Sequence, residues 1–163
     1  IVCVYGWPDT PVELTTTGIQ VRICDLRLGI QPAFAGIKHL NRLEQVMARD
    51  EWNDPSIHEG LLLDREDQVI SGIASTVVLV FGDRILTPRL VRCGVRGIMR
   101  AAILSAFRER CEQRRIMLDM LPEAHEVFVS NTIRGVFPVR RIGHWEYSIG
   151  QTTRDVQEWL AAQ

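Results

Sequence analysis

The chain has 163 residues, of which 46% are hydrophobic and 24% charged, and its formal net charge is −1. This length and composition predict one soluble globular domain with a sizeable core. A net charge near zero, without a basic stripe, argues against a nucleic-acid-binding surface. No apolar run reaches the ~18 residues that a membrane-spanning helix needs, which excludes a membrane protein of that type.

The chain opens on five residues, Ile-Val-Cys-Val-Tyr, without a basic leader. Residues 1–7 are therefore predicted as a short buried strand and not as a signal peptide. Pro11 is expected to keep the next stretch irregular. The four cysteines are far apart and include no C-x-x-C pair, which predicts reduced thiols and a cytoplasmic protein.

Residues 18–28 alternate apolar and polar side chains, which predicts a strand with one face in the core. Residues 29–37 contain a proline and a glycine, and they are expected to form a loop that delivers Lys38. Residues 40–52 have helical periodicity. Their predicted inner face consists of Leu40, Leu43, Val46 and Met47.

The middle of the chain predicts an antiparallel meander and then a helix over residues 95–110 packed against the sheet. A two-residue turn, Gly82-Asp83, is expected to join the last two strands of the meander. The predicted strands are residues 60–63, 69–70, 77–81, 84–86, 116–118, 127–129, 136–142 and 145–149.

The last element is predicted as a helix that opens with a capping box formed by Thr152 and Asp155. Its inner face would carry Val156, Trp159 and Leu160.

Lysine is used only once in this chain: the 19 basic residues are 18 arginines and Lys38. An arginine guanidinium stays protonated and cannot form an imine, whereas a lysine amine can attack a carbonyl. Lys38 is therefore a candidate nucleophile. The alternative from composition alone is a surface lysine without a chemical role.

Three glycine-containing segments could meet around an anion: the loop before Lys38, residues 71–76 and residues 92–100. A glycine turn that opens a helix leaves free backbone N–H groups, which favour phosphate. Gly97, Ile98 and Met99 form the candidate turn. Glycine also begins many helices for steric reasons alone, which is the alternative here.

Residues 35–45, Ala-Gly-Ile-Lys-His-Leu-Asn-Arg-Leu-Glu-Gln, closely resemble the segment that carries the lysine binding pyridoxal 5'-phosphate (PLP) in aminodeoxychorismate lyases. These lyases are the folate-pathway members of the fold-type IV enzymes. Residues 87–100 and 128–139 match further segments in the same order, so the resemblance extends over essentially the whole chain. It implies an α+β fold, with a mainly antiparallel, barrel-like sheet and flanking helices.

The resemblance implies PLP as the cofactor and assigns residues to it. Lys38 would be the Schiff-base lysine and the proton shuttle. In the turn that begins at Gly97, Ile98 and Met99 would offer backbone N–H groups to the phosphate. Thr132, beside Asn131, would add a further donor.

Two positions depart from the family pattern. Many members have a glutamate paired with the pyridine nitrogen where this chain has Ser71, and Thr76 stands where asparagine is frequent. A serine offers only a neutral hydrogen bond and gives a weaker electron sink, which suits an elimination better than a transamination. The alternative for Ser71 is a residue that caps a turn before Gly72.

In the family, a smaller N-terminal α/β domain precedes the stretch that begins at Ile1. Residues 1–163 are therefore expected to be the PLP-binding large domain alone, as a truncated chain of doubtful activity. Members of the family form dimers, so the resemblance implies a homodimer.

The implied reaction converts 4-amino-4-deoxychorismate, a small-molecule substrate, into 4-aminobenzoate and pyruvate. Arg134 is a candidate for a substrate carboxylate because arginine pairs bidentately with carboxylates. Alternatives are a fold-type IV aminotransferase, of the branched-chain or D-amino acid type, and a non-catalytic remnant of the fold. The histidines have no zinc-site spacing, so no metal is predicted. His39 is expected to be structural, and Cys93 to be a packing residue.

Overall fold

The computed structural model describes residues 2–6 and 11–163. The helices are α1 (Glu13–Thr17), α2 (Leu43–Arg49), α3 (Ile98–Ala106) and α4 (Gln151–Ala161), with 3-10 turns η1 (Pro32–Phe34) and η2 (Leu118–Glu123). The strands are β1 (Ile19–Leu28), β2 (Ile57–Asp64), β3 (Val69–Gly72), β4 (Thr76–Phe81), β5 (Arg84–Pro88), β6 (Cys111–Arg114), β7 (Glu126–Asn131), β8 (Gly135–Ile142) and β9 (Trp145–Glu146). None of the described helices is long and apolar enough to cross a membrane.

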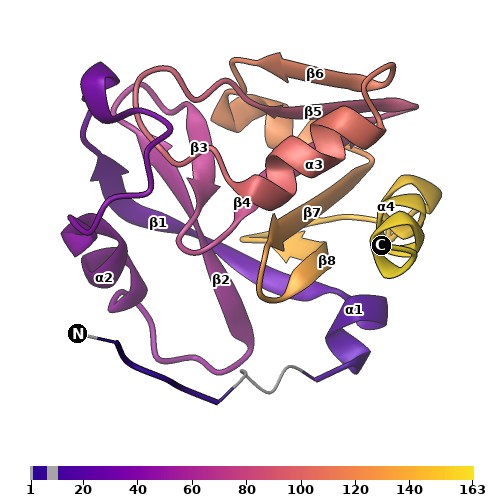
Figure 1. Cartoon of the computed structure of the whole chain (residues 1–163), viewed down its shortest axis with the longest axis horizontal. Helices are drawn as coiled ribbons and strands as arrows, with labels where there is room; N and C mark the ends of the chain where they lie inside the picture. The colour runs from indigo at the N-terminus through magenta and orange to yellow at the C-terminus, as the bar shows by residue number, and fades with distance from the viewer. Residues whose placement is uncertain (1, 7–10) are drawn as a thin grey trace.

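One curled sheet contains all the described strands, in the order β3-β2-β1-β8-β7-β4-β5-β6, with β9 beside β8 (Figure 1). Strand β1 pairs in parallel with β2 and β8, and β5 with β6, while the other pairings are antiparallel. The backbone N–H of Val69 donates to the carbonyl oxygen of Ile116 at 2.8 Å, which brings the two ends of the sheet together. The α+β, barrel-like prediction is confirmed, with a sheet that is mixed.

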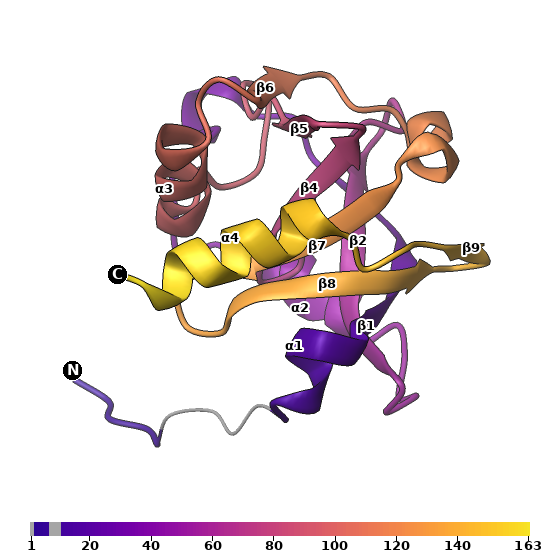
Figure 2. The same ribbon diagram turned by 90° about the vertical axis from the view of Figure 1, so that its right-hand side faces the viewer.

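Three apolar clusters hold the fold together. The largest includes residues from strands across the whole sheet, such as Val69 on β3, Val139 on β8 and Leu86 on β5, so it fills the space that the curled sheet encloses. A second lies beneath α2, around Trp52 and Leu62. A third lies between the sheet and helices α3 and α4, which Figure 2 shows on the same side of β7 and β8. We call this third region the α3–α4 face.

The first residues differ from prediction. Residues 2–6 form no regular secondary structure and are exposed, so the expected buried strand is wrong where it is described, while Ile1 and Trp7 lie outside the described residues. Alternating apolar residues favour a strand only when a neighbouring strand accepts their hydrogen bonds. The short helix α1 follows Pro11, where we expected a loop.

Helix α2 is shorter than predicted, and its apolar stripe does not face the core. It begins at Leu43 and ends at Arg49. Leu40 is 98% exposed and Leu43 69%, and Val46 and Met47 are more than half exposed. The buried residues are instead Ala48 and Trp52, which pack in the second cluster. Periodicity identifies an apolar face but does not say what covers it.

Helix α3 also starts later than predicted and leaves Ile98 76% exposed, while Ile103 is buried against the sheet. The strand predicted over 116–118 is wrong: Met117 makes only an isolated bridge to Gln68. The observed strand is β6, whose sequence Cys-Glu-Gln-Arg is polar because it lies at the edge of the sheet. Such a strand lacks the apolar signal on which prediction relies.

Helix α4 exists as predicted, with Val156 buried and Trp159 and Leu160 partly buried against the α3–α4 face. The predicted capping box is absent. The carboxylate of Glu126, on β7, accepts hydrogen bonds from the backbone N–H groups of Thr152 and Thr153 at 3.1 and 2.8 Å. A cap from a distant strand therefore replaces the local one.

The remaining strands follow prediction in type, but the expected antiparallel meander is interrupted. Strand β3 pairs with β2 and not with β4, whose neighbours are β5 and β7. Strands β1, β7 and β8 are present over nearly the predicted ranges, and β4 and β5 form the expected antiparallel hairpin, with Gly82 at φ +61°. Strand β9 is shorter than predicted, with two residues.

Candidate functional site

The loop that carries Lys38 is fixed by backbone hydrogen bonds to the segment just before α3. The N–H of Gly36 donates to the carbonyl oxygen of Gly94 at 2.8 Å, and the N–H of Arg96 donates to that of Gly36 at 3.1 Å. These bonds place the Lys38 loop, residues 29–42, directly beside the turn that opens α3. The first and third of the segments singled out in the sequence therefore meet, although they are about sixty residues apart.

Two glycines allow this close approach. Gly36 has φ +90°, and a Cβ there would lie 2.9 Å from the Cδ of Arg96. Gly94 has φ +85°, and its Cβ would lie 2.7 Å from the Cγ2 of Ile70. A side chain at either position would meet both backbone strain and a neighbouring atom. Glycine is thus required for the junction itself.

The base of the Lys38 loop is fixed by two glutamates. The backbone N–H of Gly29 donates to the Oε1 of Glu44, in α2, at 2.7 Å. The carboxylate of Glu51, just after α2, accepts from the backbone N–H groups of Asp25 and Leu26 at 2.7 and 2.9 Å.

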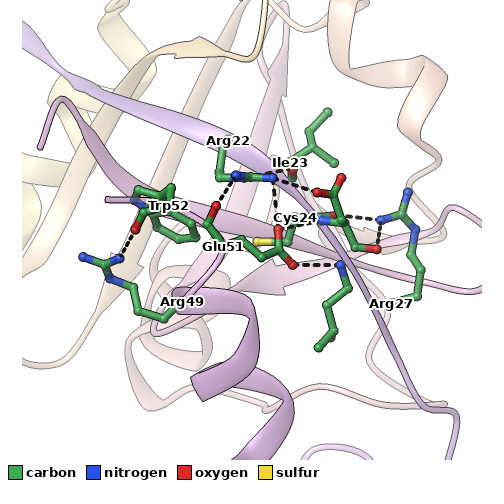
Figure 3. Close-up of polar contacts among 9 residues, drawn as sticks. Arg22, Ile23, Cys24, Arg27, Arg49, Glu51 and Trp52 are labelled. Atoms are coloured by element: carbon green, nitrogen blue, oxygen red, sulfur yellow. Dashed lines mark hydrogen bonds and ion pairs between the residues drawn. The ribbon is translucent and has the colours of Figure 1, made fainter. Parts of the chain in front are cut away.

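Figure 3 shows Glu51 at the centre of a polar cluster on β1. Its carboxylate pairs with the guanidinium of Arg22 at 3.0 Å, and the two N–H groups from which it accepts lie where β1 shifts its register against β2. The neighbouring Trp52 ring is covered by the guanidinium of Arg49, 4.7 Å from its centroid. The cluster accepts hydrogen bonds from backbone N–H groups that the irregular strand leaves unpaired. It therefore fixes the path of the chain at the end of β1, which leads into the Lys38 loop.

Lys38 itself is exposed, so its amine is accessible to an aldehyde ligand. Its neighbour His39 packs edge-on against Phe34, with ring centroids 5.9 Å apart, in agreement with a structural role. Cys93 is buried, and burial raises the pKa of its thiol to about 11, which agrees with a packing residue.

The opening of α3 has the properties of an anion site. Gly97 is its N-cap and provides no side-chain cap for the first-turn N–H groups, and it lies against Thr76: a Cβ at residue 97 would be 3.1 Å from the Oγ1 of Thr76. The uncapped N–H groups of this turn, which includes Ile98 and Met99, and the positive end of the helix dipole both favour an anion.

The turn between β7 and β8 holds the remaining candidates. The Oδ1 of Asn131 accepts from the backbone N–H groups of Ile133 and Arg134 at 3.0 and 2.7 Å, and its Nδ2 donates to the carbonyl oxygen of Ala74 at 3.2 Å. Thr132 and Arg134 are exposed in this turn. The Asn131 side chain thus shapes the turn and ties it to the turn after β3.

Ser71 lies on β3, opposite Leu62 of β2, and is partly buried. The turn that follows it is organised by Glu59 of β2. The Oε1 of Glu59 accepts from the backbone N–H of Ile73 at 3.1 Å, and its Oε2 accepts from the Oγ of Ser75 at 2.8 Å. Burial of the carboxylate raises its pKa, and these hydrogen bonds offset part of that effect.

Sequence reasoning missed Glu59. The only signal was a carboxylate directly before the apolar run Gly-Leu-Leu-Leu, inside a strand.

Two cavities lie beside these elements. The larger, of about 430 Å³, includes Glu59, Ser75, Asn131 and Arg134 in its wall. The smaller, of about 330 Å³, lies against the Lys38 loop and includes His39 and Gly94. Of the cofactor and substrate candidates, Asn131 and Arg134 line the larger cavity, and none lines the smaller one. Thr76 lies between the two regions, because it lies against Gly97 and pairs with Ser130.

The described part of the chain contains no group of three His, Cys, Asp or Glu residues that could hold a metal ion.

Comparison with known proteins gives a consistent picture. Residues 4–142 match the family model for class IV amino-transferases. An aminodeoxychorismate lyase of Vibrio harveyi is 34% identical, with 94% of this chain and 59% of the relative covered. A probable branched-chain-amino-acid aminotransferase of Thermotoga maritima is 32% identical over 88% of this chain and 57% of its own length.

Among solved structures, 4-amino-4-deoxychorismate lyase from Pseudomonas aeruginosa superposes with a TM-score of 0.94 at 38% identity. The match covers 98% of this chain and 60% of that structure. The chain thus spans about 60% of the length of these lyases. On the family match, which extends over most of its length, the chain belongs to the class IV aminotransferase family.

Proposed function

We propose that residues 1–163 form the PLP-binding large domain of a 4-amino-4-deoxychorismate lyase, which the family's smaller domain would precede in the complete protein. The observation that carries the proposal is the junction of the Lys38 loop with the opening of α3, through Gly36 and Gly94. It brings a lysine-bearing loop to a phosphate-favouring helix terminus. The likeness to the lyases of Vibrio harveyi and Pseudomonas aeruginosa supports the choice of reaction.

The residues fit PLP. The turn at Gly97 presents uncapped N–H groups that suit a phosphate, with Ile98 and Met99 as donors and Thr132 as a further one. Lys38 is the one amine side chain of the protein, and it is exposed. When bound, PLP supplies an electron-withdrawing ring that stabilises negative charge on the substrate carbon that bears the amine.

Lys38 would hold the cofactor through its Nζ and move the protons of the reaction. When not joined to the cofactor, the Nζ of Lys38 would take the proton from C4 of the substrate. It would then return a proton to the enolpyruvate that leaves from C3, which gives pyruvate. The ring that remains becomes aromatic as 4-aminobenzoate, which drives the step.

Ser71 would influence which reaction the site favours, and Arg134 would help to select the substrate. Ser71 would provide at most a neutral hydrogen bond to the ring nitrogen of PLP, which would favour this elimination over a transamination. Arg134 is exposed on the turn beside Asn131, where it could pair with a substrate carboxylate. A cytoplasmic homodimer in folate biosynthesis completes the proposal, and the exposed apolar side chains of Leu40 and Leu43 support a second subunit at α2.

The test uses the single lysine. PLP added to the chain should give a visible absorption band, and borohydride should fix one pyridoxyl group on Lys38, located by mass spectrometry. Lys38→Arg keeps the charge and should lose both signals. Lyase activity is then measured as pyruvate released from 4-amino-4-deoxychorismate.

Amino transfer to a keto acid without pyruvate release would indicate an aminotransferase. A chain with no fixed pyridoxyl group would indicate a non-catalytic remnant.

A further inference from the structure

Arg100 is a buried cation in the first turn of α3, immediately after Met99. Its side chain is enclosed, with the residue 4% exposed. Its Nε donates to the Oγ1 of Thr87 at 3.2 Å, and its Nη2 donates to the carbonyl oxygen of Pro88 and to the Oε1 of Gln113, both at 2.9 Å. These contacts connect the helix to β5 and β6.

All three acceptors are neutral. Arg100 forms no ion pair with any carboxylate that the structure describes, and neither does Arg96, four residues earlier in the chain. Burial lowers the pKa of Arg100, and the charge of Arg96 lowers it further. A guanidinium nevertheless stays protonated in proteins, so the positive charge persists without a counter-ion.

A chain of contacts connects the Arg100 side chain to the anion site at the opening of α3. Thr87, which accepts from Arg100, also donates its hydroxyl to the carbonyl oxygen of Val77 at 3.1 Å. Val77 follows Thr76, which contacts Gly97 at the helix opening. The side chain of a residue in the first turn of a helix also points back toward its N-terminus. The guanidinium therefore lies behind the first turn, on its sheet side.

We infer that Arg100 is a positioning residue for a phosphate dianion at the Gly97–Met99 turn: it holds the turn against β5 and β6, and its unpaired charge is offset when the phosphate binds. The inference rests on the proposed function for the identity of the ligand. The positive charge of Arg100 would make the site bind a phosphorylated aldehyde more tightly than an unphosphorylated one. Exposed N–H groups alone would bind an anion less selectively.

The experiment compares PLP with pyridoxal, which has the same aldehyde but no phosphate. The affinity ratio is measured by absorbance titration for wild type, Arg100→Gln and Arg100→Lys. Arg100→Gln should reduce the preference for PLP about tenfold, and Arg100→Lys should recover most of it, because it keeps the charge. A loss of affinity for both aldehydes by the same factor in both variants would mean a structural role only, and would overturn the inference.

Arg110→Gln is the matched control. Arg110 also connects distant elements, through the carbonyl oxygen of Asp83 and the Oγ1 of Thr152, but it does so beyond the C-terminal end of α3. It should lower thermal stability without changing the ratio. A ratio that falls as far in Arg110→Gln as in Arg100→Gln would contradict the inference.

A second measurement is independent of Lys38. Inorganic phosphate should raise the Tm of wild type more than chloride at matched ionic strength, and this increment should be lost in Arg100→Gln. An equal increment in both proteins would refute the role of Arg100. If wild type binds neither aldehyde yet shows the increment, the proposed function fails while the phosphate site stands.

Discussion

The α3–α4 face and the Lys38 loop are organised in opposite ways. On the α3–α4 face, Val80 and Phe128 are fully buried beneath two helices. The Lys38 loop is held by a few backbone hydrogen bonds and two glutamates, and the helix that follows it exposes Leu43 and Met47. The first region is stabilised by apolar burial within the chain. The second depends on hydrogen-bond geometry, and its apolar side chains remain open to a partner surface.

The largest expected effect contrasts one large apolar side chain from each region. Phe128→Ala removes a fully buried ring and should lower the free energy of unfolding by about 3–5 kcal/mol. Leu40→Ala removes a 98% exposed side chain and should change it by no more than about 0.5 kcal/mol. Urea unfolding of both variants measures the difference. Comparable losses would mean that the loop is packed as tightly as the α3–α4 face.

The second effect tests the glycine junction. Gly94→Ala places a methyl group 2.7 Å from buried Ile70 at φ +85°, so backbone strain and overpacking should together cost about 2–4 kcal/mol. Gly82→Ala is the control, because Gly82 also has positive φ but open space around it. It should cost about 1 kcal/mol. Equal Tm shifts in the two variants would show that the close contact of the new methyl group with Ile70 adds nothing to the cost of positive φ.

The third effect concerns the cap of α4. Glu126→Ala leaves the N–H groups of Thr152 and Thr153 unpaired in a buried position, which should cost about 2 kcal/mol. Asp155→Ala, which alters the residue of the expected capping box, should cost under about 0.5 kcal/mol. Thermal unfolding distinguishes the two. A larger loss of stability in Asp155→Ala than in Glu126→Ala would mean that the local capping box, and not Glu126, caps α4.

The smallest effect is a pH dependence at Glu59. Because burial raises its pKa in the folded protein, the carboxyl favours its protonated form there. Its contribution to stability is full below the unfolded pKa and is lost as the pH rises through the folded one. Wild type should therefore lose stability relative to Glu59→Gln as the pH rises from about 4, near the unfolded pKa, through the higher folded pKa. Urea unfolding across this range tests the sign, and a constant or rising difference would contradict it.

Local patterns in the sequence were enough for several parts of the fold and site. The alternation over β1, the apolar runs of β4, β7 and β8 and the stripe of α4 each predicted the right element. A single lysine among 19 basic residues marked Lys38, and the glycine before Ile98 marked the helix opening. Each of these signals depends on the intrinsic preferences of neighbouring residues, which the chain carries wherever it folds.

Other features required the tertiary structure. The cap of α4 by Glu126, the contact between Gly36 and Gly94 and the enclosure of Arg100 all join residues at least ten positions apart. Periodicity correctly gave α2 an apolar face but wrongly placed it in the core. The sequence by itself determined most of the core strands, the two helices α3 and α4, and which residue could be the nucleophile. Only the folded chain decided which of them meet, because burial and long-range hydrogen bonds depend on what lies opposite each side chain.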